Sequence, residues 1–271
     1  MIYTGKARVK NLPVSVVLQY FLPQHWLSKL MFRFARIKNR WIKNKFTHWF
    51  VKTYKVDLSQ AKREKVEDYV SFNDFFTRSL KVGVRPIGEG LISPVDGVVS
   101  QAGKIENGDL IQAKGKKFTL KALLGNNEKF QNFATIYLSP SDYHRIHAPL
   151  DGKLLKMDYI GGDLFSVNNQ TAHSVDNLFA RNERVVCYFD TYAIVLVGAI
   201  FVGSMETVWH GQITPPYGKC FSVDYTNKDI YLKKGEELGR FNMGSTVILL
   251  SNTYQFDSFG QVVKMGQSLS I

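Results

Sequence analysis

The sequence predicts an α+β protein, with helices at the N-terminus and a mainly antiparallel β body after them. Between Pro23 and Phe50, apolar residues repeat every three or four positions, which is the period of an amphipathic helix. After Pro86 the pattern changes to short apolar runs that Gly, Pro, Asn and Asp interrupt, as in an all-β body. The chain has 271 residues and 45% hydrophobic content, so it can bury a substantial core.

The N-terminal segment, residues 1–56, holds the whole excess of positive charge. It contains 12 Lys or Arg and no Asp or Glu, whereas the rest of the chain has 23 basic and 23 acidic residues. Nucleic acid, an anionic membrane or an acidic partner could each attract a net charge of +12. Because the charge is confined to a helical segment with aromatic residues, the distribution favours a membrane and not nucleic acid.

The periodic helix of this segment has an apolar stripe flanked by cations. The stripe follows Trp26, Leu30, Phe34, Ile37 and Trp41, and Phe46, Trp49 and Phe50 extend it. Lysines and arginines one position out of phase can reach lipid phosphates while the rings enter the head-group boundary. A helix that packs its apolar side on the protein is the alternative. A second short helix, interfacial or packing, is expected over residues 14–22, between two prolines.

Residues 57–84 form a charged connector for which we expect a helix. Ser71 and Asp74 have the spacing of a capping box at its start. Residues 85–271 form the β body, and candidate strands cover residues 97–101, 133–138, 185–189, 193–202 and 246–250. Residues 148–155 and 233–239 are similar to turns of lipoyl and biotinyl carrier domains. This likeness favours a sandwich-like fold with a carrier-like hybrid motif, although the lysine-bearing hairpin of those carriers is not evident.

Cysteine content and hydropathy predict a cytoplasmic protein that contacts membranes peripherally. Cys187 and Cys220 are too few for a disulfide framework, and no apolar signal-peptide core opens the chain. The longest apolar stretch, residues 193–202, has about half of the ~20 residues that a transmembrane helix needs. Its β-branched residues fit a buried strand better.

Three polar turns interrupt the β pattern and supply Asp96, His144, His147 and Ser245. A carboxylate can orient an imidazole, and an imidazole can deprotonate a hydroxyl, so these residue types could form a nucleophilic site. Taken singly, Asp96 before a glycine is a common turn and Gly244-Ser245 could be a simple bend. The His-x-x-His pair could also bind a metal, but no third ligand has matching spacing, so no metal is expected.

Several segments occur together in the order of a known family. They are the Asp96-Gly97 turn, Tyr143-His-Arg-Ile-His-Ala-Pro149, Gly161-Gly-Asp-Leu-Phe-Ser-Val-Asn168, Asn182-Glu-Arg-Val-Val186, Val197-Gly-Ala199 and Gly235-Glu-Glu-Leu-Gly-Arg-Phe-Asn-Met-Gly-Ser-Thr246. With them, the chain from about Phe72 to Leu250 resembles a bacterial-type phosphatidylserine decarboxylase, and the basic N-terminus resembles that family's membrane-binding region. Met243 departs from the family's usual leucine before Gly-Ser-Thr, which bears on the rate of cleavage.

The resemblance implies that the chain cleaves itself. Ser245 would attack the carbonyl of Gly244, and elimination and hydrolysis would leave a pyruvoyl group on a small chain, residues 245–271, associated with a large chain, residues 1–244. By resemblance His147 is the base and Asp96 its orienting carboxylate. Gly244 suits this step because a residue without a side chain permits close approach and a strained turn.

The resemblance also implies the reaction and its partners. The pyruvoyl group made from Ser245 would form a Schiff base with the amine of phosphatidylserine, act as the electron sink for loss of carbon dioxide, and leave phosphatidylethanolamine. His144 would lie beside the substrate carboxylate and promote reprotonation. Phe165, Ser166 and Asn168 are expected head-group contacts, although a Gly-Gly turn there is also a sound structural interpretation. The enzyme would lie on the cytoplasmic face of the cell membrane, and a homodimer is possible.

Two other function classes fit parts of the sequence. A conventional hydrolase would use Asp96, His147 and Ser245 as an uncut triad. A non-catalytic membrane adaptor or lipoyl-like carrier would bind lipid through its basic helices and a partner through its β body. The state of the backbone at Ser245 separates the first hypothesis from both.

Overall fold

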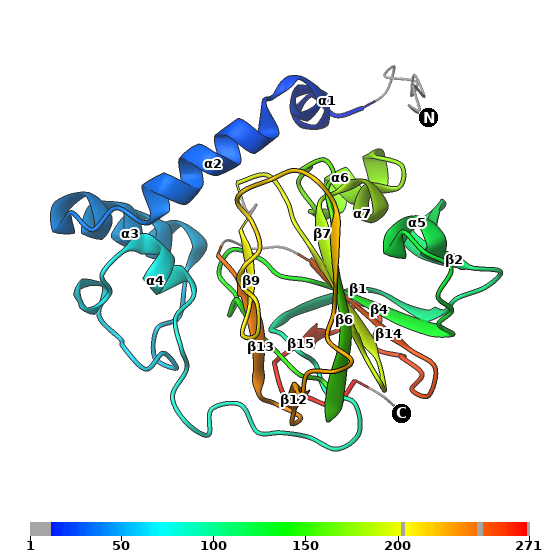
Figure 1. The fold of residues 1–271 in the computed structure, drawn as a ribbon. Helices are drawn as coiled ribbons and strands as arrows, with labels where there is room; N and C mark the ends of the chain where they lie inside the picture. The colour runs from blue at the N-terminus through cyan, green and yellow to red at the C-terminus, as the bar shows by residue number, and fades with distance from the viewer. Residues whose placement is uncertain (1–11, 202–203, 243–245, 270–271) are drawn as a thin grey trace.

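The computed structural model describes residues 12–201, 204–242 and 246–269 (Figure 1). Its largest sheet has nine strands in the order β11-β6-β7-β8-β14-β4-β1-β15, with β12 paired to β6, and all its pairs are antiparallel. The strands are β1 (Gly97–Lys104), β4 (Asn132–Tyr137), β6 (Gly152–Ile160), β7 (Arg184–Phe189), β8 (Ala193–Val197), β11 (Phe221–Asp224), β12 (Tyr231–Leu232), β14 (Thr246–Ser251) and β15 (Val262–Val263).

A four-stranded antiparallel sheet packs on one face of the large sheet. It has the order β10-β9-β13-β5, and its strands are β5 (Arg145–His147), β9 (Met205–Thr207), β10 (Gly211–Gln212) and β13 (Glu237–Phe241). Ile146 and Phe241 from this sheet share a core cluster with Leu196 and Val247 from the large one. A separate hairpin joins β2 (Asp109–Ala113) to β3 (Lys116–Thr119).

Short helices cover the opposite face of the large sheet (Figure 1). They are α5 (Leu120–Leu124), α6 (Asn169–Ser174) and α7 (Leu178–Arg181), and they share a second core cluster with Val195 and Ile248. Successive residues of β8 and β14 therefore face two different cores. Burial on both faces explains why residues 193–197 and 247–250 are apolar without interruption.

The N-terminal region forms α1 (Val14–Phe21), α2 (Gln24–Ala35) and α3 (Arg40–Tyr54), followed by a 3₁₀ turn η2 (Val66–Asp68) and α4 (Phe72–Phe76). The single periodic stripe predicted from Pro23 is divided between two helices. The break comes where the Asn39 side chain accepts hydrogen bonds from the backbone N–H groups of Trp41 and Ile42 and so begins a new helix. The Ser71 cap is confirmed, since its hydroxyl accepts from Asp74 N–H at 3.1 Å.

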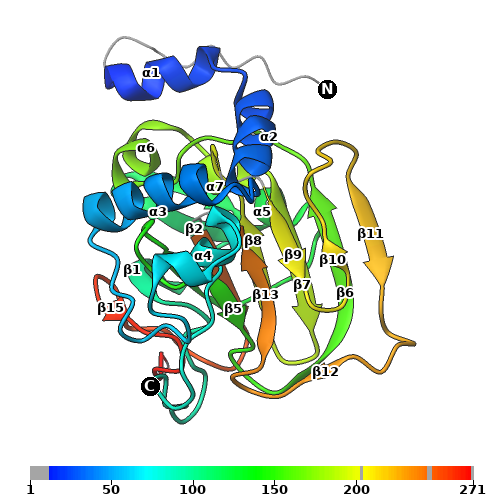
Figure 2. The ribbon, with the colours of Figure 1, turned by 90° about the vertical axis from the view of Figure 1, so that its left-hand side faces the viewer.

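The N-terminal helices turn much of their apolar surface outward. Trp26 and Trp41 are 62% and 71% exposed, whereas Gln24 and Ser28 on the inner side of α2 are buried. The C-terminal part of the stripe faces inward, because Phe50 packs on α4 in a third core cluster. Figures 1 and 2 show α1–α3 along one side of the β body. Within the described residues, no helix combines the length and apolar character needed to cross a membrane.

The α+β class, with N-terminal helices and a mainly antiparallel sheet, is confirmed. The strand expected over residues 193–202 ends at Val197, because Gly198 donates its N–H to the Glu183 carbonyl and Phe201 adopts a φ of 65°. The likeness to carrier domains stays a prediction.

Candidate active site

The predicted cleavage position lies where the chain crosses between the two sheets. β13 ends at Phe241 in the small sheet, and β14 begins at Thr246 in the large one. Met243, Gly244 and Ser245 lie outside the described residues. The neighbours of this link can be described: Phe241 N–H donates to the His144 carbonyl, and Thr246 pairs with Tyr137 and Val197.

His147 on β5 is held as a neutral imidazole with a defined tautomer. Its Nδ1 lies 2.7 Å from the Gly235 carbonyl oxygen, which can only accept, so Nδ1 carries the hydrogen. Its Nε2 then accepts from the Tyr143 hydroxyl at 2.9 Å. Burial lowers the pKa of His147, and burial raises the pKa of Tyr143. Nε2 is therefore the unprotonated nitrogen, and it can take a proton once the Tyr143 hydroxyl gives up its hydrogen bond.

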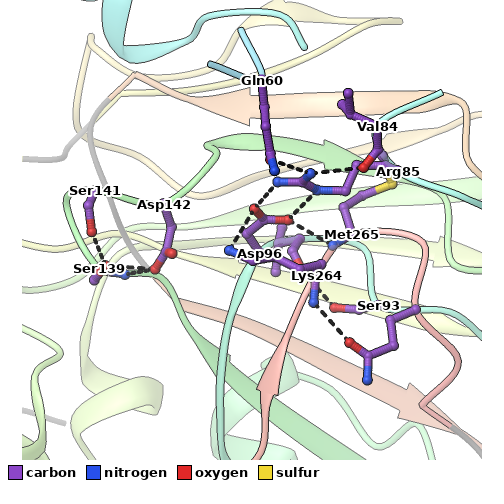
Figure 3. A network of polar contacts seen from close by, with 12 residues as sticks. Gln60, Val84, Arg85, Ser93, Asp96, Ser139, Ser141, Asp142, Lys264 and Met265 are labelled. Atoms are coloured by element: carbon purple, nitrogen blue, oxygen red, sulfur yellow. Dashed lines mark hydrogen bonds and ion pairs between the residues drawn. The ribbon is translucent and has the colours of Figure 1, made fainter. Parts of the chain in front are cut away.

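Asp96 sits at the start of β1 in a network of cations (Figure 3). Its carboxylate accepts from Arg85 Nη2 at 2.6 Å, from Lys264 Nζ at 3.3 Å and from the backbone N–H of Met265 at 2.8 Å. Burial by itself raises the pKa of Asp96, but the hydrogen bonds from Arg85 and Met265 outweigh it, so its pKa lies below the usual range. Asp96 is thus an ionised, paired carboxylate.

The structure brings Asp96 to Arg85 and not into hydrogen-bond contact with His147, whose ring nitrogens bind Gly235 and Tyr143 instead. The two residues are linked through the backbone, since the His147 N–H donates to the Pro94 carbonyl at 2.9 Å. The predicted orienting contact therefore differs from the observed geometry. Arg85 lies eleven residues before Asp96 and Lys264 lies 168 residues after it, so no local spacing pointed to this network.

His144 is also neutral, and one of its nitrogens has no hydrogen-bond partner in the described part of the chain. Nδ1 lies 2.8 Å from the Asp142 carbonyl oxygen, so it carries the hydrogen, and Nε2 is buried with no hydrogen-bond partner among the described residues. The ring packs against Phe76 with centroids 4.1 Å apart. Burial, with a smaller effect of the Arg78 charge, lowers the pKa of His144 to about 3. A buried acceptor without a partner is costly, which marks this nitrogen for a ligand or a reacting group.

The connector supplies residues to this site that sequence reasoning missed. Asn73 on α4 donates from Nδ2 to Asn242 Oδ1 at 3.1 Å, directly before the link. Arg78, after α4, donates to the Ser141 carbonyl at 2.9 Å and is buried. The feature of the sequence that could have identified Asn73 and Arg78 is their position beside the three phenylalanines of residues 72–76.

The predicted head-group segment is tied to the N-terminal helices. Gln19 Oε1 accepts from the Ser166 N–H at 2.8 Å, and Gln24 Oε1 accepts from the Leu164 N–H at 2.7 Å. Phe165 is buried in the second core cluster, and Asn168 caps α6 by accepting from Thr171 N–H at 2.9 Å. Phe165 and Asn168 therefore have structural roles in this state, and Ser166 is only partly buried.

Glu183 is a buried carboxyl that keeps its proton well above the pH at which an exposed glutamate loses it. It accepts from the Tyr159 hydroxyl at 2.9 Å and lies beside Gly198, just beyond the end of β8. Burial raises the pKa of Glu183 to about 7. No group of three or more His, Cys, Asp or Glu among the described residues could hold a metal ion.

Comparison with known proteins gives this site a family. A family model described as phosphatidylserine decarboxylase matches residues 72–270, and a model described as PSD matches residues 14–55. The chain is 49% identical to a phosphatidylserine decarboxylase proenzyme of Shewanella denitrificans, over 95% of this chain and 97% of the relative. It is 47% identical to the proenzyme of Francisella philomiragia, over 95% and 98% of the two chains, and 50% identical to that of Pseudomonas fluorescens, over 94% and 96%.

The fold, the site and these matches define an enzyme of the carboxy-lyase class that is made as a proenzyme and serves phospholipid biosynthesis. The resemblance found in the sequence motifs is confirmed. The chain belongs to the phosphatidylserine decarboxylase family.

Replacing Glu183 by Gln should stabilise the protein at high pH and not at low pH. The folded-state pKa of about 7 lies above the usual value of 4.5, so the folded state holds a proton that the unfolded state has lost. Wild-type stability therefore falls as pH rises from 4.5 to 7 by about 1.4 kcal/mol per pH unit, or about 3 kcal/mol in all, and Gln does not titrate. Urea denaturation at pH 5 and pH 8 measures this. An equal gain at both pH values would contradict it, and exposed Glu106→Gln is the control.

Proposed function

We propose that this protein decarboxylates phosphatidylserine to phosphatidylethanolamine with a pyruvoyl group that it makes from Ser245. The observation that carries the proposal is the buried Nε2 of His144, which has no hydrogen-bond partner among the described residues, on a residue whose backbone carbonyl accepts from the N–H of Phe241, three residues before Gly244. Together with the neutral Nε2 of His147, it supplies two proton acceptors in a dry site, as a reaction with an amine and a hydroxyl requires. The residues present therefore fit a pyruvoyl group at position 245.

For self-processing we assign the base to His147. Its Nε2 would take the proton of the Ser245 hydroxyl as the oxygen attacks the Gly244 carbonyl, because Nδ1 is committed to Gly235. Asp96 would act at a distance. With Arg85 it fixes the turn whose Pro94 carbonyl binds the backbone of His147.

In decarboxylation the pyruvoyl carbonyl supplies an electron sink for the carbon that bears the amine. His144 would promote the return of a proton. Its buried Nε2, which has no hydrogen-bond partner among the described residues, would hydrogen-bond the substrate beside the carbon that has lost carbon dioxide and help that carbon regain a proton. Ser166, which is partly exposed beside the N-terminal helices, would contact the head group.

The two chains left by cleavage would stay associated. In the small chain, residues 245–271, β14 lies between β8 and β4, and β15 pairs with β1. Val247 and Leu249 are buried in one core, and Ile248 and Leu250 in the other. Cutting before a central strand leaves this pairing in place.

The N-terminal helices would bind the cytoplasmic face of the cell membrane. Exposed apolar side chains on α1–α3 include Leu18, Phe21, Trp26, Leu30, Trp41 and Trp49. Lysines and arginines lie among them, and the segment has no acidic residue. An outward apolar face with cations beside it fits an anionic lipid surface, and it disfavours the alternative in which this face packs on the protein.

Ser245→Ala should abolish both cleavage and carbon dioxide release, because it removes the attacking oxygen and the source of the pyruvoyl group. Intact mass should show two chains for the wild type and one chain for the variant. Ser258→Ala, in the same small chain, should cleave normally. A wild type that stays a single 30.9 kDa chain with a free serine would refute the proposal, and labelling of Ser245 in that chain by a serine-directed phosphonate would favour a conventional hydrolase.

His147→Asn should slow cleavage by about 10²–10⁴-fold, as expected for loss of a general base. Tyr143→Phe should slow it by about 10-fold or less, since the hydroxyl only holds His147 in place. The rate of appearance of the small chain on a gel measures both. His173→Asn, at an exposed position of α6, is the control. Equal cleavage rates in the His147 variant and the control would rule out His147 as the base.

Trp26→Ala combined with Trp41→Ala should weaken binding to anionic phosphatidylglycerol vesicles by about 10-fold or more, because two exposed rings no longer enter the interface. Vesicle co-sedimentation gives the affinity. Phe259→Ala with Val262→Ala removes comparably exposed apolar groups near β15 and should bind like the wild type. Undiminished binding by the tryptophan variant would show that α2 and α3 do not form the lipid contact.

A further inference from the structure

Two buried arginines have no acidic partner among the described residues, and they differ in how many of their guanidinium nitrogens have hydrogen-bond partners there. Arg184 is 3% exposed, and its three guanidinium nitrogens donate to the carbonyls of Leu123, Asn182 and Ala122. Arg78 is 4% exposed, and only Nη2 has partners, the carbonyls of Ser141 and Asp142. Its Nε and Nη1 have none among the described residues.

An unpaired buried guanidinium is costly to fold. Ionised groups removed from water need a counter-charge or a complete set of hydrogen bonds, and Arg184 shows that backbone carbonyls alone can provide the latter. No ion pair among the described residues includes Arg78. The Nε and Nη1 groups, which have no partner among the described residues, can therefore donate hydrogen bonds to a bound anion. A planar guanidinium has the geometry for two parallel hydrogen bonds to a carboxylate or a phosphate.

The position of Arg78 identifies which anion. Arg78 Nη2 and His144 Nδ1 donate to the same oxygen, the Asp142 carbonyl, at 3.3 Å and 2.8 Å. Phe76, two residues before Arg78, packs on the imidazole ring. The guanidinium is thus next to the group assigned to the reacting carbon. In phosphatidylserine the carboxylate is bonded directly to that carbon, whereas the phosphodiester is separated from it by a methylene and an oxygen.

We propose that Arg78 is the binding site for the substrate's carboxylate. This inference rests on the proposed function and adds a residue to it. Holding the carboxylate at a fixed position beside His144 orients the carbon–carbon bond that breaks, and orientation of this kind lowers the barrier. Carbon dioxide leaves with no charge. The product has therefore lost the carboxylate that Arg78 binds, and it is released more readily.

The test compares substrate with product. Wild type, Arg78→Lys, Arg78→Met and Arg184→Met are checked for folding and cleavage, and KM for phosphatidylserine and Ki for phosphatidylethanolamine are measured in the same mixed micelles. Arg78→Met should cleave, raise KM by about 10- to 100-fold and leave Ki within about threefold. Arg78→Lys should give a smaller rise, since it keeps the charge and loses the fork. Arg184→Met should lower the melting temperature and leave the ratio of KM to Ki unchanged.

Several results would overturn the proposal. An unchanged KM shows that Arg78 does not bind the carboxylate. Equal weakening of substrate and product places the phosphodiester at Arg78 instead. If the Arg78 variants fold but do not cleave, Arg78 acts in self-processing. If neither variant folds, Arg78 has a structural role. A wild type that neither cleaves nor releases carbon dioxide refutes the proposed function itself, whatever the variants do.

Discussion

The position of the site depends on the double pairing of β14. Thr246 is held opposite Tyr137 of β4 on one side and Val197 of β8 on the other, and the next four residues continue both ladders. On the other sheet, Phe241 at the end of β13 is held against His144. The chain must cross from one sheet to the other within four residues, between two fixed ends. The two pairings therefore fix both ends of the link in which the predicted cleavage position lies.

The polar groups around the link between β13 and β14 keep the imidazoles of His144 and His147 neutral. Each histidine gives its Nδ1 hydrogen to a backbone carbonyl, Gly235 for His147 and Asp142 for His144, and neither donates to a carboxylate. A carbonyl fixes the tautomer without the charge that would favour protonation. The carboxylate nearby, Asp96, is neutralised by Arg85. The result is a pair of proton acceptors in a dry, positively charged surrounding, which suits chemistry on an anionic substrate.

Much of the fold could be predicted from the sequence because it depends on periodicity. The helical stripe, the uninterrupted apolar strands and the Ser71 cap are each visible as a pattern of neighbouring residues, and the folded structure retains all three. Contacts between distant segments have no such signature. The residue types at Asp96, His144 and His147 identified a candidate site, but the partners that set their protonation are Arg85, Tyr143 and backbone carbonyls, which only the folded chain brings together. Arg78 was missed because a buried guanidinium near a histidine is a tertiary feature.

The bonds from Gln19 and Gln24 to the segment around Ser166 have a consequence for handling the protein. Removing the first two helices is an obvious way to obtain a version that tolerates aqueous buffer. That truncation would also remove two acceptors that now satisfy the backbone N–H groups of Leu164 and Ser166, and would expose Phe165, which Tyr20 covers. The N-terminal helices are therefore packed into the β body, and solubility is better sought by changing their outer faces than by deleting them.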